Sequence, residues 1–319
     1  MTNDIKLGVL VPTGQAQWAT GGARALTDFA ARAEDLGYDS LWVNDSLLTP
    51  RIEALTMLAA LAPVTSRVTL GTAALLPVLR RPVLAAQTLA SVDQLSGGRL
   101  VVAVGAGFPG RFGQPLHDLS GVPWERRFAR LDETVALWRQ LWASSGPTSW
   151  HGEIHSFDEI PQATAPHQPG GPPIWLGGAS PAALRRTGRH YDGWLPYPPD
   201  PADYASGLAQ ISRAAADAGR ATDAVQPALF VSVLVAASVA EGREALEGYA
   251  QGGYGLTLAE LEKIQAVVTG PPQEVAAQLR RYSGAGARHL VCRLGATGLP
   301  AQQEQLAQLA AIAPLLRQA

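Results

Sequence analysis

The chain offers one carboxylate in a position suited to chemistry, Asp45 in the stretch WVNDSLLTP. An apolar run ends at Val43, and three polar residues, Asn44 to Ser46, follow where a strand should stop. Asp45 is therefore either a turn residue or an acid carried to the rim of a pocket, where it could move a proton.

A second candidate site is the segment WLGGASPAALRR. Gly177 and Gly178 allow the backbone to approach a ligand closely. Ser180 is a natural N-cap and Pro181 suits the first turn of a helix, so free N–H groups and the positive helix end would face the pocket. The segment predicts a site for an anion, above all a phosphate; the alternative is an ordinary connection with a well-formed cap.

Three other kinds of chemistry find little support. His151 and His155 lie in the strand-like run HGEIH, where four residues span about 13 Å and do not suit a zinc site. Cys292 lies within an apolar run without a paired histidine motif, which indicates a buried structural thiol rather than a nucleophile. The G-x-S-x-G elbow of serine hydrolases does not occur in the sequence.

The glycine-rich segment GAGFPG, residues 105–110, matches the pattern G-x-G-x-x-G. Pro109 and the long segment before Trp124 prevent a helix from starting at these glycines, and no acid ends a second strand about 20 residues further on. We interpret the segment as a glycine loop that could press against a flat ligand, not as a dinucleotide fingerprint.

Composition narrows the class of protein. The 319 residues are 47% hydrophobic and 16% charged, and the formal net charge of -2 with no run of like charge argues against nucleic acid and membrane surfaces as partners. No apolar run approaches the roughly 20 residues of a membrane helix, and the N-terminus lacks the features of a signal peptide. With one cysteine, we expect a cytoplasmic protein whose partners are small molecules or a second copy of itself.

Short apolar runs alternate with segments of helical spacing. Strands are predicted over residues 5–12, 40–44, 67–76, 99–104, 173–178, 192–196, 227–236 and 289–294. Because these runs are apolar on both faces, they indicate a parallel sheet covered by helices. We predict an α/β fold with one domain over residues 1–319, a single (β/α)8 TIM barrel with irregular insertions near 145–173 and 240–270. An open doubly wound sheet is the alternative, but at this length it usually splits into two domains, and no linker is visible.

The segments that follow the predicted strands are rich in glycine and alanine and poor in histidine. In a barrel of this kind the chemistry lies on these segments. A site with so few acid–base groups suggests that a bound cofactor supplies the reactivity.

Three long stretches resemble the bacterial luciferase-like superfamily of flavin- and F-420-dependent oxidoreductases. They are ARAEDLGYDSLWVND, TSRVTLGTAALLPVLRRPVLAAQTLASVDQLSGGRLVVAVGAG and PIWLGGASPAALRRTGRHYDGWLP. The resemblance implies a (β/α)8 barrel that binds FMN or the deazaflavin coenzyme F-420 at the carboxyl ends of its strands, and it leaves the choice of cofactor open. It also implies a homodimer formed through helices near the first three strands.

The resemblance further assigns residues to the cofactor. The family places a non-prolyl cis peptide behind the isoalloxazine ring, which corresponds here to the bond between Ala73 and Ala74 in GTAALLP. Asp45 and Ser46 would lie beside the ring. The loop that lines the cofactor, the phosphate-binding turn and an arginine that reaches the phosphate correspond to Gly105, Gly107, Arg111, Gly177, Gly178, Ala179, Ser180 and Arg127.

For Arg127, an ordinary helix-surface arginine is the alternative, and Arg126 and Arg130 compete for the same role. Phe108, Trp194 and Arg293 are candidate substrate contacts. Arg293 ends the eighth predicted strand, where a cation could hold an anionic substrate group or cofactor tail, or could pair with an acid at the rim.

Two departures from the family pattern matter. Many members that use F-420 have a histidine in the position of Ser46 and another in that of Arg81, and the first of these acts as proton donor or acceptor. Histidine-based acid or base catalysis is therefore not expected here. We predict an oxidoreductase in which reduced FMN or F-420 reduces or mono-oxygenates a small organic substrate, with Asp45 as the catalytic proton carrier. The alternatives are a non-catalytic flavin-binding protein of the same fold and a metal-dependent barrel hydrolase.

Overall fold

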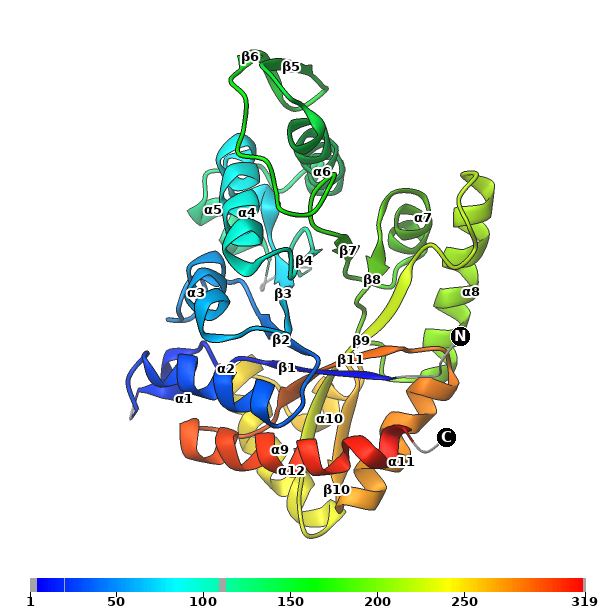
Figure 1. Cartoon of the computed structure of the whole chain (residues 1–319). Coiled ribbons are helices and arrows are strands. Elements are labelled where there is room, and N and C mark those ends of the chain that lie inside the picture. The colour runs from blue at the N-terminus through cyan, green and yellow to red at the C-terminus, as the bar shows by residue number, and fades with distance from the viewer. Residues whose placement is uncertain (1–4, 20, 109–112, 318–319) are drawn as a thin grey trace.

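Eight apolar segments of the chain form parallel strands that close into a barrel (Figure 1). The computed structural model describes residues 5–19, 21–108 and 113–317. The barrel strands are β1 Lys6–Leu10, β2 Ser40–Val43, β3 Thr69–Leu75, β4 Leu100–Val104, β7 Ile174–Leu176, β8 Gly193–Trp194, β9 Gln226–Val235 and β11 His289–Leu294. The pairing of β8 with β9 closes the ring, which confirms the predicted barrel.

Helices cover the outside of the barrel and follow the strands in sequence (Figure 1). The longer ones are α2 Ala25–Asp35, α3 Ala54–Leu61, α4 Pro82–Ser96, α6 Arg127–Ala143, α7 Pro181–His190, α8 Pro201–Asp217, α11 Pro272–Gly284 and α12 Leu299–Arg317. Short helices are α1 Gln15–Trp18, α5 Gln114–Leu119, η1 Ala62–Val64 and η2 Pro77–Leu79. Helix α4 shows why the boundaries were predictable: Pro82 occupies its first turn, and Gly97 ends it at a left-handed φ of 65°.

The interior of the barrel is filled by two large rings and the glycines opposite them. The rings of Trp42 and Trp175 lie 5.2 Å apart. A Cβ on Gly71 would lie 2.4 Å from the Trp42 ring, and a Cβ on Gly193 would lie 2.4 Å from the Trp175 ring. Only glycine leaves room for these indoles, so this part of the barrel is a packed core.

The two predicted insertions have different outcomes. Residues near 145–173 contain the antiparallel hairpin of β5 Thr148–His151 and β6 Ser156–Ile160, which projects away from the barrel (Figure 1). The prediction of an irregular segment near 240–270 is wrong. That segment forms α9 Val239–Tyr254, α10 Leu258–Leu261 and β10 Val267–Gly270, and β10 pairs with the second half of β9.

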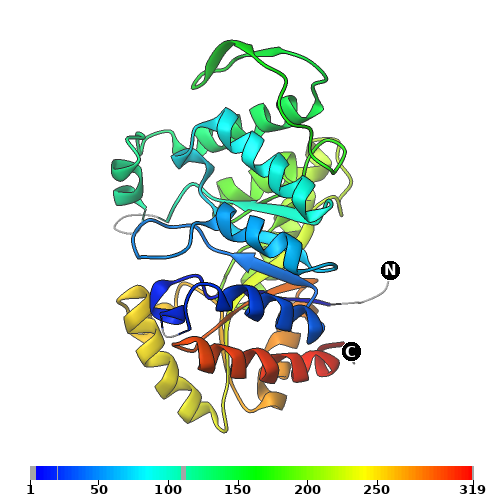
Figure 2. The same ribbon diagram turned by 60° about the vertical axis from the view of Figure 1, so that its left-hand side comes forward.

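The sequence of α9 contains a helical pattern of apolar residues, but glycines within the segment weaken it. Leu246, Tyr249 and Ala250 are buried at helical spacing. Glycines at 248, 252 and 253 interrupt the pattern and lower the helix propensity of the segment. In Figure 2, α9 and α10 (yellow) lie on the same side as α1 and α5, opposite the two ends of the chain. No helix among the described residues is long and apolar enough to cross a membrane.

A buried carboxylate ties α2 to the segment before β3 and gives a testable pH dependence. Glu34 accepts backbone N–H bonds from Ser66, Arg67 and Val68 at 2.7–3.1 Å. Burial alone would raise the pKa of Glu34, but these bonds outweigh it and lower the pKa from 4.5 to about 2. Because the pKa is depressed in the folded state, the stabilisation is complete above pH 4.5 and is lost as pH falls toward 2.

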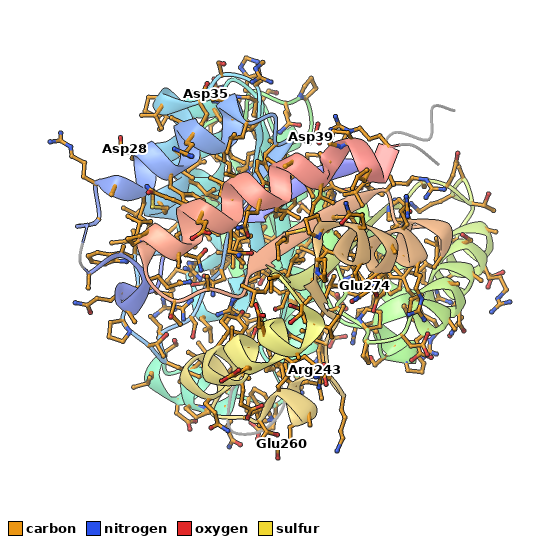
Figure 3. All side chains as sticks on the ribbon, turned by 90° about the horizontal axis from the view of Figure 1, so that it is seen from below. Asp28, Asp35, Asp39, Arg243, Glu260 and Glu274 are labelled. Atoms are coloured by element: carbon orange, nitrogen blue, oxygen red, sulfur yellow. The ribbon has the colours of Figure 1, made fainter. Side chains whose placement is uncertain are left out.

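We expect Glu34→Gln to lower the free energy of unfolding by at most about 3 kcal/mol at neutral pH, with the difference from wild type shrinking on acidification. Denaturant titrations between pH 7 and pH 3 measure this difference. Asp35→Asn is the matched control, because Asp35 lies on the exposed side of the same helix (Figure 3). A Glu34→Gln deficit that does not change with pH would contradict this explanation.

Candidate active site

Four neighbouring strands carry most of the predicted site at their carboxyl ends. Strands β2, β3, β4 and β7 are consecutive in the sheet, so their ends form one arc of the barrel mouth. Asp45 follows β2, Ala73 and Ala74 lie near the end of β3, Gly105 follows β4, and Gly177 follows β7. The structure therefore brings these residues to the end of the barrel where chemistry takes place in such folds.

The end of β3 presents backbone and small side chains. The peptide bond between Ala73 and Ala74 is cis, as predicted. The Gly105 N–H donates to the carbonyl of Leu75 at 2.9 Å, and a Cβ on Gly105 would lie 3.8 Å from that of Ala74. These residues leave a surface without bulky side chains, which suits the face of a planar ring.

The carboxylate of Asp45 is fully engaged by the neighbouring strand end. It accepts a hydrogen bond from the Leu76 N–H at 2.9 Å, and both of its oxygens accept from the Arg80 guanidinium at 2.5 and 3.1 Å. The Asp45 side chain is 8% exposed, and Arg80 also donates to Glu53 at 2.7 Å. Leu76 follows the cis bond closely, so Asp45 ties the segment after β2 to the end of β3.

Ser46 has a local role in the structure. Its hydroxyl accepts the N–H of Leu48 at 3.2 Å, which is a turn contact within the same segment. Both ring-side assignments of Asp45 and Ser46 stay predictions, but only Asp45 contacts the end of β3.

The turn after β7 has the features of an anion site. Gly178 has a φ of 91°, a conformation that favours glycine. The Ser180 hydroxyl accepts the N–H of Ala183 at 3.2 Å and caps α7, while Ala179 and Ser180 are themselves exposed. Helix α7 therefore points its positive end toward the open side of this turn.

Trp194 supports this turn from behind. Its indole N–H donates to the carbonyl of Gly178 at 2.9 Å, and its fully buried ring stacks on Tyr204 at 4.8 Å. A Cβ on Gly207 of α8 would lie 2.6 Å from the Trp194 ring, so the ring packs between strand and helices. The prediction that Trp194 contacts substrate is wrong, because the residue alternation of β8 turns its side chain away from the barrel interior.

A pocket of about 360 Å³ opens beside the β7 turn. Gly178 and Ala179 line one side, and Tyr197, Asp203 and Gln210 belong to the other walls. A ligand held by the turn would have room to extend between α7 and α8.

Two aromatic rings lie between this pocket and the loop after β4. Phe108 is 40% exposed, and its ring stacks on that of Tyr197 with centroids 5.4 Å apart. Burial, with a smaller effect of Tyr254, raises the pKa of Tyr197 to about 12, so its hydroxyl is protonated at neutral pH. Phe108 thus offers an apolar surface beside Tyr197, and its role toward substrate stays a prediction.

Arg127 lies at the start of α6 with a guanidinium stacked on the Trp124 ring at 3.8 Å. Its Nε is buried and has no hydrogen-bond partner among the described residues. Arg126, in contrast, pairs with Glu153 of the hairpin. Arg127 and its competitor Arg130, whose Nε is likewise buried without a partner among the described residues, each keep a donor for a ligand, whereas Arg126 is committed elsewhere. Arg111 lies outside the described residues.

Comparison with known proteins decides the family. The family model described as "Luciferase-like monooxygenase" matches residues 5–289. The chain belongs to the luciferase-like monooxygenase family.

Curated relatives of this luciferase-like chain are named as F420-dependent enzymes or reductases. An F420-dependent glucose-6-phosphate dehydrogenase of Amycolatopsis mediterranei is 34% identical over 186 residues, 54% of this chain and 53% of the relative. A phthiodiolone/phenolphthiodiolone dimycocerosates ketoreductase of Mycobacterium bovis is 32% identical over 248 residues, 68% of this chain and 62% of the relative. The matched region thus spans only about half to three fifths of these relatives.

Solved structures show the same fold over the whole length. An F420-dependent secondary alcohol dehydrogenase in complex with an F420-acetone adduct has a TM-score of 0.83 at 20% identity, covering 98% of this chain and 99% of its own. A type II Baeyer-Villiger monooxygenase of Pseudomonas putida in complex with FMN has a TM-score of 0.76 at 18% identity, covering 98% of each chain. Both likenesses show the fold of this chain; the first of these proteins is named as F420-dependent, and the second was solved in complex with FMN.

Three residues that contact the candidate site or lie beside it were missed by sequence reasoning. Arg80 holds Asp45 from 35 residues away, and Arg51 and Tyr254 come from segments that the strand pattern gave no reason to single out. Tyr254 stands in the region predicted to be irregular. In the sequence, Arg80 could be noticed only as a cation close to the predicted end of β3.

The residues considered for other chemistries lie apart from this mouth. No three histidine, cysteine, aspartate or glutamate side chains in residues 5–19, 21–108 and 113–317 are grouped to hold a metal ion. His151 contacts Ser156 within the hairpin, and His155 lies beside Thr134. Cys292 is fully buried, and burial raises the pKa of its thiol, as expected for a structural cysteine.

Proposed function

We propose that the chain is an oxidoreductase that uses reduced coenzyme F-420, with FMN as the second candidate, to reduce or mono-oxygenate a small organic substrate. The observation that carries the proposal is the β7 turn, in which the left-handed Gly178 and the capped start of α7 lie at the edge of a pocket. Family membership supplies the class of chemistry.

The phosphate of either cofactor fits the turn of Gly177, Gly178, Ala179 and Ser180. Exposed backbone at a helix N-terminus binds oxyanions through N–H groups and the helix dipole. The Nε of Arg127, at the start of α6, has no partner among the described residues and offers one further donor.

The planar ring fits the small-residue surface of Ala73, Ala74 and Gly105, with Gly107 in the adjoining loop at a φ of 90°. A bound reduced cofactor would supply the hydride, and FMN in particular would also allow oxygen chemistry. The protein contributes position and exclusion of water, because the packed indoles of Trp42 and Trp175 close the barrel below the mouth.

We assign Asp45 to positioning rather than to proton transfer. Both of its oxygens accept from Arg80, and one also accepts from Leu76, so the carboxylate holds the backbone that would carry the ring. Since Ser46 and Arg81 stand where many F-420 enzymes have histidine, a proton would come from water, the substrate or a tyrosine at the rim.

The choice of F-420 rests on the curated relatives, several of which are named as F420-dependent. We expect titration of the apoprotein to show fluorescence quenching with F-420 at concentrations at least about tenfold lower than with FMN. Tighter binding of FMN would make FMN the proposed cofactor and would leave the proposed class of enzyme unchanged. Binding of neither would contradict the proposal as a whole.

Turnover distinguishes the enzyme from its alternative, a non-catalytic flavin-binding protein. Reduced holoprotein would be mixed with oxygen and with candidate ketones, alcohols and aldehydes in a stopped-flow instrument. Reoxidation no faster than that of the free reduced cofactor would favour the non-catalytic reading. A homodimer through helices near the first three strands stays a prediction, and Leu84 and Leu95 of α4 expose apolar surface there.

A further inference from the structure

Two arginines approach the mouth from either side of β1. Strand β1 lies between β11 and β2 in the sheet. Arg293 stands near the carboxyl end of β11, two residues after Val291, which packs in the barrel interior. Residues two apart share one face of a strand, so Arg293 is directed to the interior at the level of the mouth. Arg51 lies after β2 and is paired through a backbone bridge with Gly14, which follows β1.

Arg293 is held in place by two tyrosines of α9. Its Nη1 donates to the hydroxyl of Tyr254 at 2.5 Å, and its guanidinium lies 4.9 Å from the Tyr254 ring centre and 5.2 Å from that of Tyr249. The Tyr254 hydroxyl accepts this bond, and a phenol that accepts one hydrogen bond can also donate its own proton. A half-buried cation is thus oriented with an O–H donor beside it.

Arg51 retains hydrogen-bonding capacity. It donates to the Thr49 hydroxyl at 2.5 Å, and its Nε is buried without a partner among the described residues. Burial lowers the pKa of Arg51, and the charge of Arg293 lowers it further, while Asp45 opposes the effect. Arg51, bridged to the segment after β1, and Arg293, near the end of β11, thus flank the carboxyl end of β1.

The nearby acids do not compensate for these two cations. Asp45 and Glu53 both accept hydrogen bonds from Arg80. Within the part of the chain that the structure describes, neither Arg51 nor Arg293 has a carboxylate at salt-bridge distance. These five charged side chains carry a net charge of one positive unit at neutral pH. Two cations without a carboxylate partner, of which Arg51 has an unused buried donor, are the arrangement expected of a site completed by an anion.

The arginine corner, formed by Arg51, Arg293 and Tyr254, lies across the barrel from the β7 turn. In the closed order of strands, four steps separate β7 from β1 in either direction. One candidate anion site thus stands on each side of the mouth, with the small-residue surface of β3 and β4 between them.

We propose that Arg51 and Arg293, with the hydroxyl of Tyr254, bind an anionic group of the substrate, a carboxylate or a phosphate ester. This inference rests on the proposed function in one respect, namely that the β7 turn takes the phosphate of the cofactor. The substrate would then lie over the β1 side of the mouth with its reacting carbon toward β3.

The test measures anion binding separately from cofactor binding. Holoprotein saturated with F-420 or FMN, in which the β7 turn is filled, would be titrated calorimetrically at constant ionic strength with inorganic phosphate and with acetate. We expect saturable binding of at least one probe to wild type, and a Kd at least about tenfold higher in Arg51→Gln and in Arg293→Gln. Arg213→Gln, an exposed arginine of α8, is the matched control and should bind like wild type.

The two probes also identify the group. Tighter binding of phosphate assigns a phosphate ester, tighter binding of acetate assigns a carboxylate, and either supports the site. Arg293→Lys keeps the charge and should lose less affinity than Arg293→Gln, which keeps the test decisive if the glutamine variant does not fold. Equal Kd values in wild type and both glutamine variants, or no probe binding to wild type, would overturn the proposal.

Cofactor titration of the same variants separates this inference from the proposed function. We expect Arg51→Gln and Arg293→Gln to bind cofactor like wild type. A tenfold loss of cofactor affinity in them would assign the corner to the cofactor's own anionic tail and overturn the substrate assignment. If wild type binds no cofactor, the proposed function fails, while phosphate and acetate titrations of the apoprotein still decide whether the arginine corner binds anions.

Discussion

Replacing Asp45 with alanine is expected to lower the free energy of unfolding by about 3–5 kcal/mol and to weaken cofactor binding at least about tenfold. The substitution leaves the Arg80 guanidinium without its bidentate partner and the Leu76 N–H without an acceptor. Because Arg80 and Asp45 are only 22% and 8% exposed, solvent replaces these contacts poorly. Denaturant titration and fluorescence quenching measure the two losses.

Ser46→Ala is the matched control, since it removes only a turn contact to Leu48 in the same segment. We expect it to change the free energy of unfolding by less than about 1 kcal/mol. Small and equal effects of the two alanine variants would return Asp45 to the role of a turn residue.

Asp45→Asn separates positioning from proton transfer. The amide keeps an oxygen for the Leu76 N–H but loses the charge that pairs with Arg80. A positioning role predicts weaker cofactor binding with an unchanged shape of the pH–rate profile of kcat. Disappearance of one limb of that profile, with cofactor affinity intact, would instead assign Asp45 as the proton carrier.

The fold could be predicted because its local signals agree with one another. Pro82 and Gly97 mark the two ends of α4, and eight apolar runs separated by helical patterns fit a parallel barrel. The same local reasoning failed at α9, where glycines hide a helix that packs through Leu246 and Tyr249. What decides that helix is burial against the barrel, which is not a local property.

The site could be predicted only in part, for a similar reason. The Ser180 cap stands within a short motif that the sequence shows directly, whereas the cis Ala73–Ala74 bond was predicted from the family resemblance of the segment GTAALLP. The Asp45–Arg80 pair spans 35 residues and depends on which way a side chain leaves the end of its strand. Trp194 shows the same limit, because a strand of two residues carries too little pattern to tell an inward ring from an outward one.

Trp42 illustrates how the packed interior serves the mouth, and its removal should be the most damaging change in the barrel. Its fully buried ring contacts Trp175, and its indole N–H donates to the Ser40 hydroxyl at 2.7 Å. Ala73, on the cis peptide, packs against the same cluster. We expect Trp42→Ala to lower the free energy of unfolding by about 3–5 kcal/mol and to weaken cofactor binding, because the cavity lies beneath the end of β3.

Trp150→Ala makes the same chemical change in a half-buried ring of the β5–β6 hairpin, away from the barrel. It should cost less stability and leave cofactor affinity unchanged, so loss of affinity in both variants would show a general effect of destabilisation.

The packing around Trp42 can be tested by introducing Gly71→Ala both into wild type and into the Trp42→Ala variant. A Cβ on Gly71 would lie 2.4 Å from the Trp42 ring, so Gly71→Ala should destabilise wild type by about 1–3 kcal/mol. The same substitution in Trp42→Ala should cost nothing or restore stability, because the added methyl then fills space that the indole has vacated.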